Sequence, residues 1–186
     1  MAEYKVIVMV GSLRKDSYNK KIARALPGLR AAPLQFEIVE IGNLPLYNED
    51  LDNGQPPAAW TSFRDQVGAG DALLFVTPEY NRSVPGCLKN AIDVASRPYA
   101  QSVLDGKPGA VISSTPFALG AFGANQHLRQ CMVFLNVPTM QQPEAYIGGV
   151  KSLFDSEGNL THSSSRDFLA KFLQAFAKWI EANKKK

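Results

Sequence analysis

Polar side chains that suit an anion follow the first apolar stretch of the chain. Residues 4–10 (YKVIVMV) predict a buried strand, and the segment GSLRKDSYN comes directly after it. Gly11 permits a tight turn, and Arg14 offers a planar guanidinium that matches phosphate oxygens. A helix expected from Ser17 would direct its free N–H groups to the same place. We therefore expect this segment, the first loop (residues 11–19), to bind the phosphate of a nucleotide-like cofactor. The side-chain donors within it are Ser12, Arg14, Ser17 and Asn19.

The first loop differs from the two commonest phosphate-binding motifs. It lacks the G-x-G-x-x-G pattern of dinucleotide-binding folds and the G-x-x-x-x-G-K-[ST] pattern of nucleoside triphosphate-binding loops. A plainer interpretation stays open, because Gly, Ser and Asn also serve as turn and capping residues between any strand and helix.

Two later segments have the composition of binding loops. The second loop (residues 77–86, TPEYNRSVPG) carries two prolines that fix its path, an aromatic surface at Tyr80, and amides around Glu79 and Asn81 that suit a heterocycle. Alternatively, Pro85 and Gly86 merely start the next helix. The third loop (residues 113–123, SSTPFALGAFG) is rich in small residues and hydroxyls, which allow close approach to a planar ligand.

Strand and helix patterns alternate along the whole chain. Apolar runs predict strands over 4–10, 36–41, 72–77, 109–114 and 138–142, and helical spacing predicts helices over 17–29, 57–67, 85–96, 125–135 and from Asp167 onward. Ser164 and Asp167 resemble a capping box for the last helix. The alternation predicts a three-layer α/β sandwich with a parallel sheet, in which ligands bind at the carboxyl ends of the strands. All three loops are expected at that edge.

Composition limits the classes of function. The chain has 186 residues, 45% of them hydrophobic, which fits a single domain over residues 1–186. A net charge of +3 without clustering argues against nucleic acid, and the absence of a long apolar run argues against a membrane span. The 2 cysteines form no C-x-x-C pair, and with only 2 histidines no metal site is expected. These features predict a cytoplasmic protein.

Taken together, the first two loops resemble those of a known family. The patterns GSLRxxSxN and TPEYNxSxPGxLKNAID are similar to those of NADPH-dependent FMN reductases, and within that family to bacterial chromate- and quinone-reducing flavoproteins. The resemblance covers essentially the whole chain. It implies a flavodoxin-like fold with a five-stranded parallel sheet in the order 2-1-3-4-5 and one bound FMN per subunit.

The resemblance also implies roles for individual residues. Around the FMN phosphate it places Ser12, Arg14, Ser17, Tyr18 and Asn19. Around the flavin ring and ribityl chain it places Pro78, Glu79, Tyr80 and Asn81, with Ser114 and Thr115 on the other side. Arg97 resembles a position that helps to bind NAD(P)H or an anionic substrate.

The family is dimeric or tetrameric, so the resemblance implies a homo-oligomer, with Gln126, Arg129 and Glu144 at an interface. This chain departs from the family in the third loop, where Ala121 and Phe122 replace a frequent pair of glycines. We expect Phe122 to narrow the space above the flavin ring.

These features together predict an FMN-dependent enzyme that passes a hydride from NADPH or NADH, by ping-pong kinetics, to small-molecule acceptors such as quinones, free flavin, chromate or azo compounds. The flavin carries the electrons, so no catalytic side chain is expected. A flavodoxin-type electron carrier is the alternative, although such carriers tend to be acidic. A response-regulator domain would need an acidic pair where Gly11 and Ser12 stand.

Overall fold

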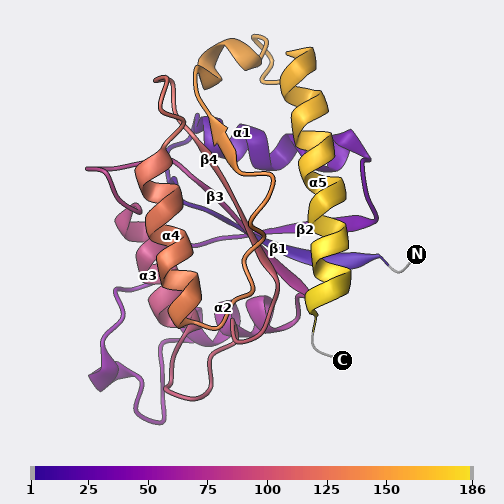
Figure 1. Ribbon diagram of the computed structural model, residues 1–186. Coiled ribbons are helices and arrows are strands. Elements are labelled where there is room, and N and C mark those ends of the chain that lie inside the picture. Colours follow the sequence, from indigo (N-terminus) through magenta and orange to yellow (C-terminus); the bar gives the residue numbers. More distant parts are fainter. Residues whose placement is uncertain (1–2, 185–186) are drawn as a thin grey trace.

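In the computed structural model, which describes residues 3–184, a parallel sheet runs through the centre of the molecule (Figure 1). Its five strands lie in the order β2-β1-β3-β4-β5. They are β1 (Tyr4–Val10), β2 (Leu34–Val39), β3 (Ala72–Thr77), β4 (Gly109–Ser114) and β5 (Ala145–Ile147). The order that the family resemblance implies is therefore confirmed.

Helices cover both faces of the sheet. They are α1 (Tyr18–Ala25), α2 (Ala58–Gly68), α3 (Gly86–Ala95), α4 (Phe122–Phe134) and α5 (Ser163–Asn183), with short 3-10 turns η1 (Pro27–Leu29), η2 (Glu49–Leu51) and η3 (Val150–Leu153). Val6 and Val8 of β1 pack with α1 and α5, whereas Ile7 and Met9 pack with α2, α3 and α4. This alternation follows from the two-residue period of a strand, and it makes the three layers.

The largest difference from the sequence prediction concerns the last strand. The strand predicted over 138–142 is wrong: Thr139 makes only an isolated bridge to Gly109, and β5 itself begins at Ala145. Pro143 between these two points has no N–H to donate, so the pairing with β4 cannot run on through it.

Several helices begin or end at residues other than those predicted from the sequence, and the reasons are local. The last helix starts at Ser163, and its N-cap is His162, so the capping box at Ser164 and Asp167 is wrong; the hydroxyl of Ser164 contacts His162 Nδ1 instead, at 3.2 Å. The first helix ends at Ala25 and is followed by the turn η1, which Pro27 begins. The fourth helix starts three residues earlier than predicted, at Phe122.

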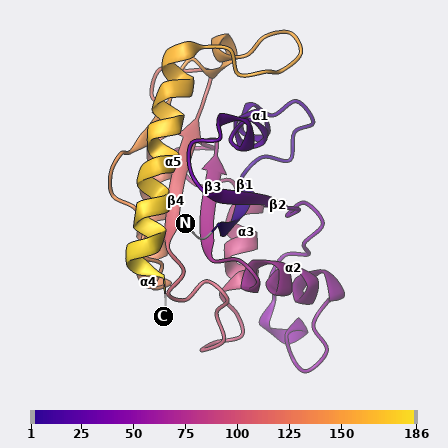
Figure 2. The ribbon, with the colours of Figure 1, turned by 90° about the vertical axis from the view of Figure 1, so that its right-hand side faces the viewer.

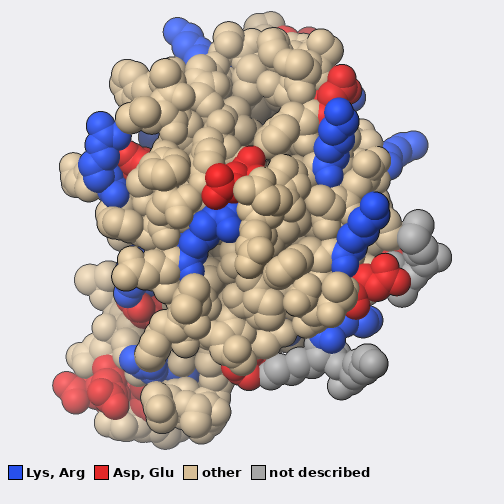
Figure 3. Space-filling view, in the orientation of Figure 1, with Lys and Arg blue, Asp and Glu red and all other residues tan. Residues whose placement is uncertain are grey.

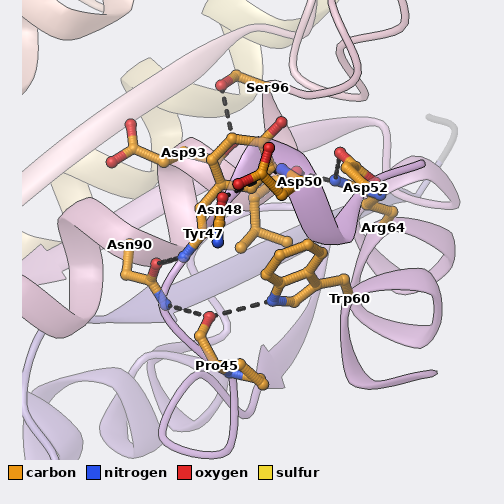
Figure 4. Close-up of polar contacts among 11 residues, drawn as sticks. Pro45, Tyr47, Asn48, Asp50, Asp52, Trp60, Arg64, Asn90, Asp93 and Ser96 are labelled. Atoms are coloured by element: carbon orange, nitrogen blue, oxygen red, sulfur yellow. Dashed lines mark hydrogen bonds and ion pairs between the residues drawn. The ribbon is translucent and has the colours of Figure 1, made fainter. Parts of the chain in front are cut away.

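A long connection between β2 and α2 is fastened to the neighbouring helices (Figure 4). Asn90 of α3 accepts a hydrogen bond from Tyr47 N (2.8 Å) and donates to the carbonyl oxygens of Leu44 and Pro45 (3.2 and 3.0 Å). Trp60 Nε1 donates to the same Pro45 oxygen (3.0 Å). The connection is thus held against the middle of α3, the helix that follows the second loop.

An ion pair completes this network. Arg64 of α2 makes two hydrogen bonds to Asp52, at 2.9 and 2.7 Å, and its Nε donates to the carbonyl oxygen of Val94 at 2.9 Å. Both charged side chains are nearly buried. The Arg64 guanidinium holds the pKa of Asp52 below its usual range, and burial raises the pKa of Tyr47, with the Asp52 charge adding to the effect.

Within the described part of the chain, no helix is both long enough and apolar enough to cross a bilayer.

Candidate cofactor site at the carboxyl edge of the sheet

The first loop leaves β1 at a point where there is no room for a side chain. Gly11 N donates to the carbonyl oxygen of Val76 at 2.9 Å, so the chain still runs beside β3. A Cβ at Gly11 would lie 2.7 Å from Thr77 Oγ1 and 3.0 Å from a methyl group of Leu88. Close packing against the second loop and α3 therefore requires glycine here.

The first loop presents donors that the protein itself does not use. Within residues 3–184, the backbone N–H groups of residues 13–16, 18 and 19 donate to no protein acceptor. Ser17 is the N-cap of α1 and accepts from Lys20 N at 3.3 Å. Ser12 and Ser17 are almost fully buried, whereas Arg14 is exposed. Free amides at a helix start, with an arginine beside them, suit an anion.

Asn19 joins the first loop to the third. Its Nδ2 donates to the Ser114 carbonyl oxygen at 3.5 Å, and Ser114 Oγ donates to Asn19 Oδ1 at 3.0 Å. Asn19 is 4% exposed and Ser114 is completely buried. This reciprocal pair holds the start of α1 against the carboxyl end of β4.

Replacing Ser114 with alanine is expected to lower the free energy of unfolding by about 1–3 kcal/mol, because Asn19 Oδ1 would stay buried without its donor. Urea unfolding at neutral pH measures the change. Ser152→Ala is the control: its hydroxyl donates to Gly149 O at 2.9 Å but is exposed, so its loss should cost less than 1 kcal/mol by the same reasoning. Equal losses in the two variants would contradict the structural role assigned to the pair.

The second loop folds into a tight turn at the same edge. Tyr80 and Ser83 exchange backbone hydrogen bonds of 3.1 and 2.9 Å, and the two residues between them, Asn81 and Arg82, have positive φ angles of 50° and 62°. The amides of Glu79 and Asn81 donate to no partner within the described residues. The Tyr80 side chain is 53% exposed at the rim. The loop therefore offers two free amides and an aromatic surface to a ligand.

Glu79 fastens the second loop to α4. Its Oε2 accepts from Ala124 N at 3.2 Å in the first turn of that helix, and its Oε1 accepts from Arg82 at 2.9 Å. A Cβ at Gly123 would lie 2.9 Å from both Glu79 Oε2 and the Arg82 carbonyl oxygen, so glycine is needed there. A carboxylate at a helix N-terminus also offsets the helix dipole. This capping explains why α4 begins earlier than the sequence pattern indicates.

The third loop rests on a buried polar network. Ser113 Oγ donates to the Gly120 carbonyl oxygen at 2.7 Å and accepts from Asn125 Nδ2 at 3.1 Å. Arg129 then donates to Asn125 Oδ1 and to the Met140 carbonyl oxygen, each at 2.9 Å. Thr115 N donates to the Ile147 carbonyl oxygen at 3.0 Å. The loop is consequently pinned to β5 and to α4 on both sides.

A cavity of about 340 Å³ separates the second and third loops. Its lining residues are Glu79, Asn81, Arg82, Thr115, Phe117, Leu119 and Ala121. The volume is in the range of small-molecule sites. Phe122 is not part of this lining, because its ring packs against Tyr146 with centroids 5.2 Å apart. The expectation that Phe122 narrows the space above the flavin ring stays a prediction, and the apolar side chains that line the cavity itself are Phe117 and Leu119.

Comparisons with known proteins agree with this geometry. The model of the family described as NADPH-dependent FMN reductase matches residues 4–151. The chain belongs to the NADPH-dependent FMN reductase family. Among curated proteins, a quinone reductase of Pseudomonas putida is 59% identical over 181 residues, covering 97% of each chain. A 2-hydroxy-1,4-benzoquinone reductase of a Burkholderia species is 47% identical, covering 95% of this chain and 96% of the other.

A solved structure shows the same fold. FerB of Paracoccus denitrificans, described as a flavoenzyme NAD(P)H:(acceptor) oxidoreductase, aligns with a TM-score of 0.90 and 42% identity over 98% of this chain and 100% of the other. The flavodoxin-like architecture expected of an FMN reductase is therefore established for this chain.

The residues present fit the FMN that the family uses. The free amides, hydroxyls and Arg14 of the first loop suit its phosphate, and the cavity between the second and third loops suits a planar ring. Tyr18, expected near the phosphate, stacks its ring on Phe154 at 6.4 Å, with Lys21 Nζ 5.5 Å from the ring centroid. Its side chain thus packs toward the segment before α5.

The structure separates Arg97 from the other expected site residues. Arg97 follows the C-terminal end of α3, and that helix runs back from the carboxyl edge of the sheet. It lines a different cavity, of about 360 Å³, together with Tyr99, Phe134 and Asn136. Within one copy of the protein, Arg97 therefore does not line the cavity between the second and third loops.

Some residues with structural roles at the site were not predicted. Arg129 and Gln126, expected only at an interface, bind within the chain; Gln126 Nε2 donates to Tyr146 Oη at 2.6 Å. Burial and the nearby Glu144 raise the pKa of Tyr146. Burial likewise raises the pKa of Cys87, on the helix after the second loop, so this thiol stays protonated. The sequence gives no signal for Glu79 as a cap of α4, because it lies 45 residues before Ala124, from whose amide it accepts a hydrogen bond.

Proposed function

We propose that this FMN reductase transfers electrons from NAD(P)H to quinones and related small planar acceptors through the bound FMN. The observation that carries the proposal is the convergence of three loops at one edge, with free amides on one side and a cavity between the second and third loops. Two relatives that are 59% and 47% identical are described as quinone reductases, which supports this acceptor class.

The first loop binds the phosphate in this proposal. Arg14 and the free amides supply charge-assisted hydrogen bonds, and Ser12 and Ser17 supply hydroxyls. Asn19 acts mainly through Ser114, which it positions at the end of β4. The phosphate is held at the N-terminus of α1, where the helix dipole favours negative charge.

The second and third loops orient the ring. Amides of Glu79 and Asn81 point fixed dipoles at the position where negative charge grows during reduction, and such preorganised donors need no rearrangement. Pro78 and Tyr80 shape one wall, and Thr115 shapes the other. Bound FMN supplies the redox chemistry, which is hydride acceptance from NAD(P)H followed by electron transfer to the acceptor.

The rim of the cavity fits an aromatic acceptor. Tyr80, Phe117 and Leu119 are 53%, 77% and 61% exposed around it. Exposed apolar side chains that surround a cavity commonly mark a binding site for an apolar or planar ligand. Chromate is a small anion, so the apolar rim favours a planar organic acceptor, such as a quinone or an azo compound, over chromate.

We further propose that the protein works as a cytoplasmic homo-oligomer, a dimer or tetramer. Val133, Phe134 and Tyr99 are 81%, 80% and 83% exposed, and the last two line the same cavity as Arg97. Uncharged side chains dominate the face over α4 (Figure 3). A second copy that covers this surface would place Arg97 at the interface between the two copies. Gln126 and Glu144 on the adjoining surface would complete the interface.

The test is an absorbance spectrum of the purified protein before and after anaerobic addition of NADPH or NADH, followed by addition of a quinone. Flavin bands that bleach with the nucleotide and return with the quinone are expected. Bands that persist with both nucleotides would favour the electron carrier, and a protein that fails to bind added FMN would overturn the proposal.

Arg14→Ala is expected to weaken FMN binding by about 1.5–3 kcal/mol, because one charge-assisted contact to the phosphate is lost. Fluorescence titration of the apoprotein with FMN measures the dissociation constant. The same titration with riboflavin, which has no phosphate, should be unaffected by the substitution. An FMN dissociation constant equal to that of the wild type would exclude Arg14 from the phosphate site.

A further inference from the structure

The two residues at the tip of the second loop have a backbone conformation that such residues rarely adopt. Asn81 and Arg82 have φ angles of 50° and 62°, where a residue with a Cβ is strained, arginine more so than asparagine. Strained residues of this kind persist only where the surrounding contacts enforce their conformation, and they are concentrated at functional sites. The tip therefore depends on contacts with the rest of the protein.

The second loop is supported differently from the other two. The first loop runs directly into α1, and the turn of residues 156–160, which projects over α1 in Figure 2, faces it across a cavity of about 590 Å³. The third loop is joined to β5, since Ser113 Oγ donates to the Ala145 carbonyl oxygen at 3.3 Å. The second loop instead lies beside the first turns of α4 (Figure 1), and its side-chain contacts are with that helix.

Two of these contacts lie on either side of the strained residues. Before them, Glu79 Oε2 accepts from Ala124 N at 3.2 Å; after them, Ser83 Oγ shares a hydrogen bond with His127 Nδ1 at 2.9 Å. Ala124 and His127 are three residues apart, so they are neighbours on one face of α4. The tip is thus fastened to the same helix at both ends.

The tip that is held in this way faces the cavity assigned to the flavin ring. Glu79, Asn81 and Arg82 line that cavity, and the amides of Glu79 and Asn81 donate to no partner within the described residues. His127 is exposed and does not belong to the described residues that line the cavity. It therefore acts on the site only through Ser83.

We propose that His127 is a positioning residue, whose hydrogen bond to Ser83 holds the amides of Glu79 and Asn81 toward the flavin ring. The inference rests on the proposed function, since it concerns the bound FMN. Fixed donors at this place stabilise the reduced ring, which carries more negative charge, more than the oxidised ring. Loss of the hydrogen bond should therefore weaken the binding of reduced FMN more than that of oxidised FMN, which lowers the reduction potential.

The experiment measures the midpoint potential of FMN in the purified holoprotein by equilibration with a reference dye. We expect His127→Ala to weaken the binding of reduced FMN about fivefold relative to oxidised FMN, as suits one exposed hydrogen bond. This corresponds to a fall of about 20 mV, at about 30 mV per tenfold for two electrons. The dissociation constant of oxidised FMN should change less than about twofold. Ser83→Ala should give the same fall, and the double variant no larger one.

A conservative variant and a control distinguish the hydrogen bond from the helix. His127→Asn places an amide atom close to the position of Nδ1 and should restore the potential of the wild type. Asparagine favours a helix less than alanine, so a role confined to the stability of α4 predicts the opposite order of the two variants. Gln130→Ala, at an exposed position of the same helix, should leave the potential unchanged.

Hydrogen exchange of the apoprotein tests the contact without the cofactor. If Ser83 and His127 hold the tip, the amides of residues 79–83 should exchange faster in His127→Ala than in the wild type or in Gln130→Ala, while those of β3 are unchanged. Equal exchange at these amides in all three proteins would show that His127 does not hold the loop, and would overturn the inference.

The outcomes separate this inference from the function on which it rests. If the wild type does not bind FMN, the proposed function fails and this inference fails with it. If the wild type binds FMN and its potential is unchanged in both His127→Ala and Ser83→Ala, the function stands and the role of His127 is overturned. A fall that Gln130→Ala also shows, or that His127→Asn does not reverse, would assign the effect to α4 and overturn it as well.

Discussion

Gly120→Ala is expected to lower the free energy of unfolding by about 2–4 kcal/mol, through two separate effects. Gly120 has a φ of +59°, where any residue with a Cβ is strained. Its Cβ would also lie 2.6 Å from the Tyr146 carbonyl carbon and 2.9 Å from Ile147 N, which are backbone atoms of β5 and cannot move aside cheaply. Either the third loop or the edge strand must shift.

A matched control separates strain from overlap. Gly149 has nearly the same φ, +58°, but a Cβ there would meet no atom within 4 Å. Gly149→Ala should therefore cost only the backbone strain, about 1 kcal/mol. Urea unfolding of the two variants gives the comparison, and equal losses would show that Gly120 is required for its conformation alone.

Gly120→Ala should also weaken the binding of FMN. Ser113 Oγ donates to the Gly120 carbonyl oxygen at 2.7 Å, so a displaced residue 120 disturbs the end of β4, where Ser114 and Thr115 lie. We expect the FMN dissociation constant of Gly120→Ala to rise at least about tenfold, a loss of about 1.4 kcal/mol. If Gly120→Ala and Gly149→Ala bind FMN with equal affinity, the shift of residue 120 does not disturb the FMN site.

Elements with a strong local signal were predicted correctly from the sequence. The strands β1, β3 and β4 have the bounds that the sequence predicts, because a strand buried on both faces is mostly apolar and so gives a nearly continuous apolar run. The edge strand β5 has only three residues and no such run, so its position depends on its pairing with β4. The start of α4 likewise depends on Glu79, which lies 45 residues before Ala124 and accepts a hydrogen bond from its amide.

The sequence predicted which segments form the site more fully than it predicted how they are held together. The three loops were recognised from glycine, proline and hydroxyl residues, and they do lie at one edge. The contacts that fix them join distant positions, as in the pair of Asn19 and Ser114, which is separated by 95 residues. The spacing of residues along the sequence does not indicate that two such distant side chains are hydrogen-bonded. Arg97 shows the converse, since a residue expected at the site lies at the far end of α3.

Asp52→Asn is expected to lower the free energy of unfolding at neutral pH by about 3 kcal/mol, because Arg64 would remain buried without a counter-charge. The side chains of Arg64 and Asp52 are only 11% and 5% exposed, and their two hydrogen bonds measure 2.9 and 2.7 Å. The exposed pair of Lys89 and Asp93, also 2.7 Å apart, is the control. Asp93→Asn should cost no more than about 1 kcal/mol, since solvent screens that pair.

The pH dependence provides an independent check on the Asp52 pair. Arg64 lowers the pKa of Asp52 in the folded state, so the unfolded state binds more protons at acidic pH. The stabilisation is therefore complete above the pKa of an unfolded aspartate, about 3.9, and is lost as the pH falls through the lower folded value. Urea unfolding at several pH values should give a constant difference between wild type and Asp52→Asn from about pH 7 to about pH 5, and a shrinking one below about pH 4.

The structural role of the pair predicts which regions move when it is lost. Asp52 belongs to the connection between β2 and α2, and Asn90 ties the same connection to α3, directly after the second loop. Loss of the Asp52 pair should increase hydrogen exchange at the amides of residues 44–54 first, while Asn90 continues to hold Tyr47 N. Exchange that instead rises uniformly over the whole chain would show that the pair contributes to global stability without locally fixing the connection.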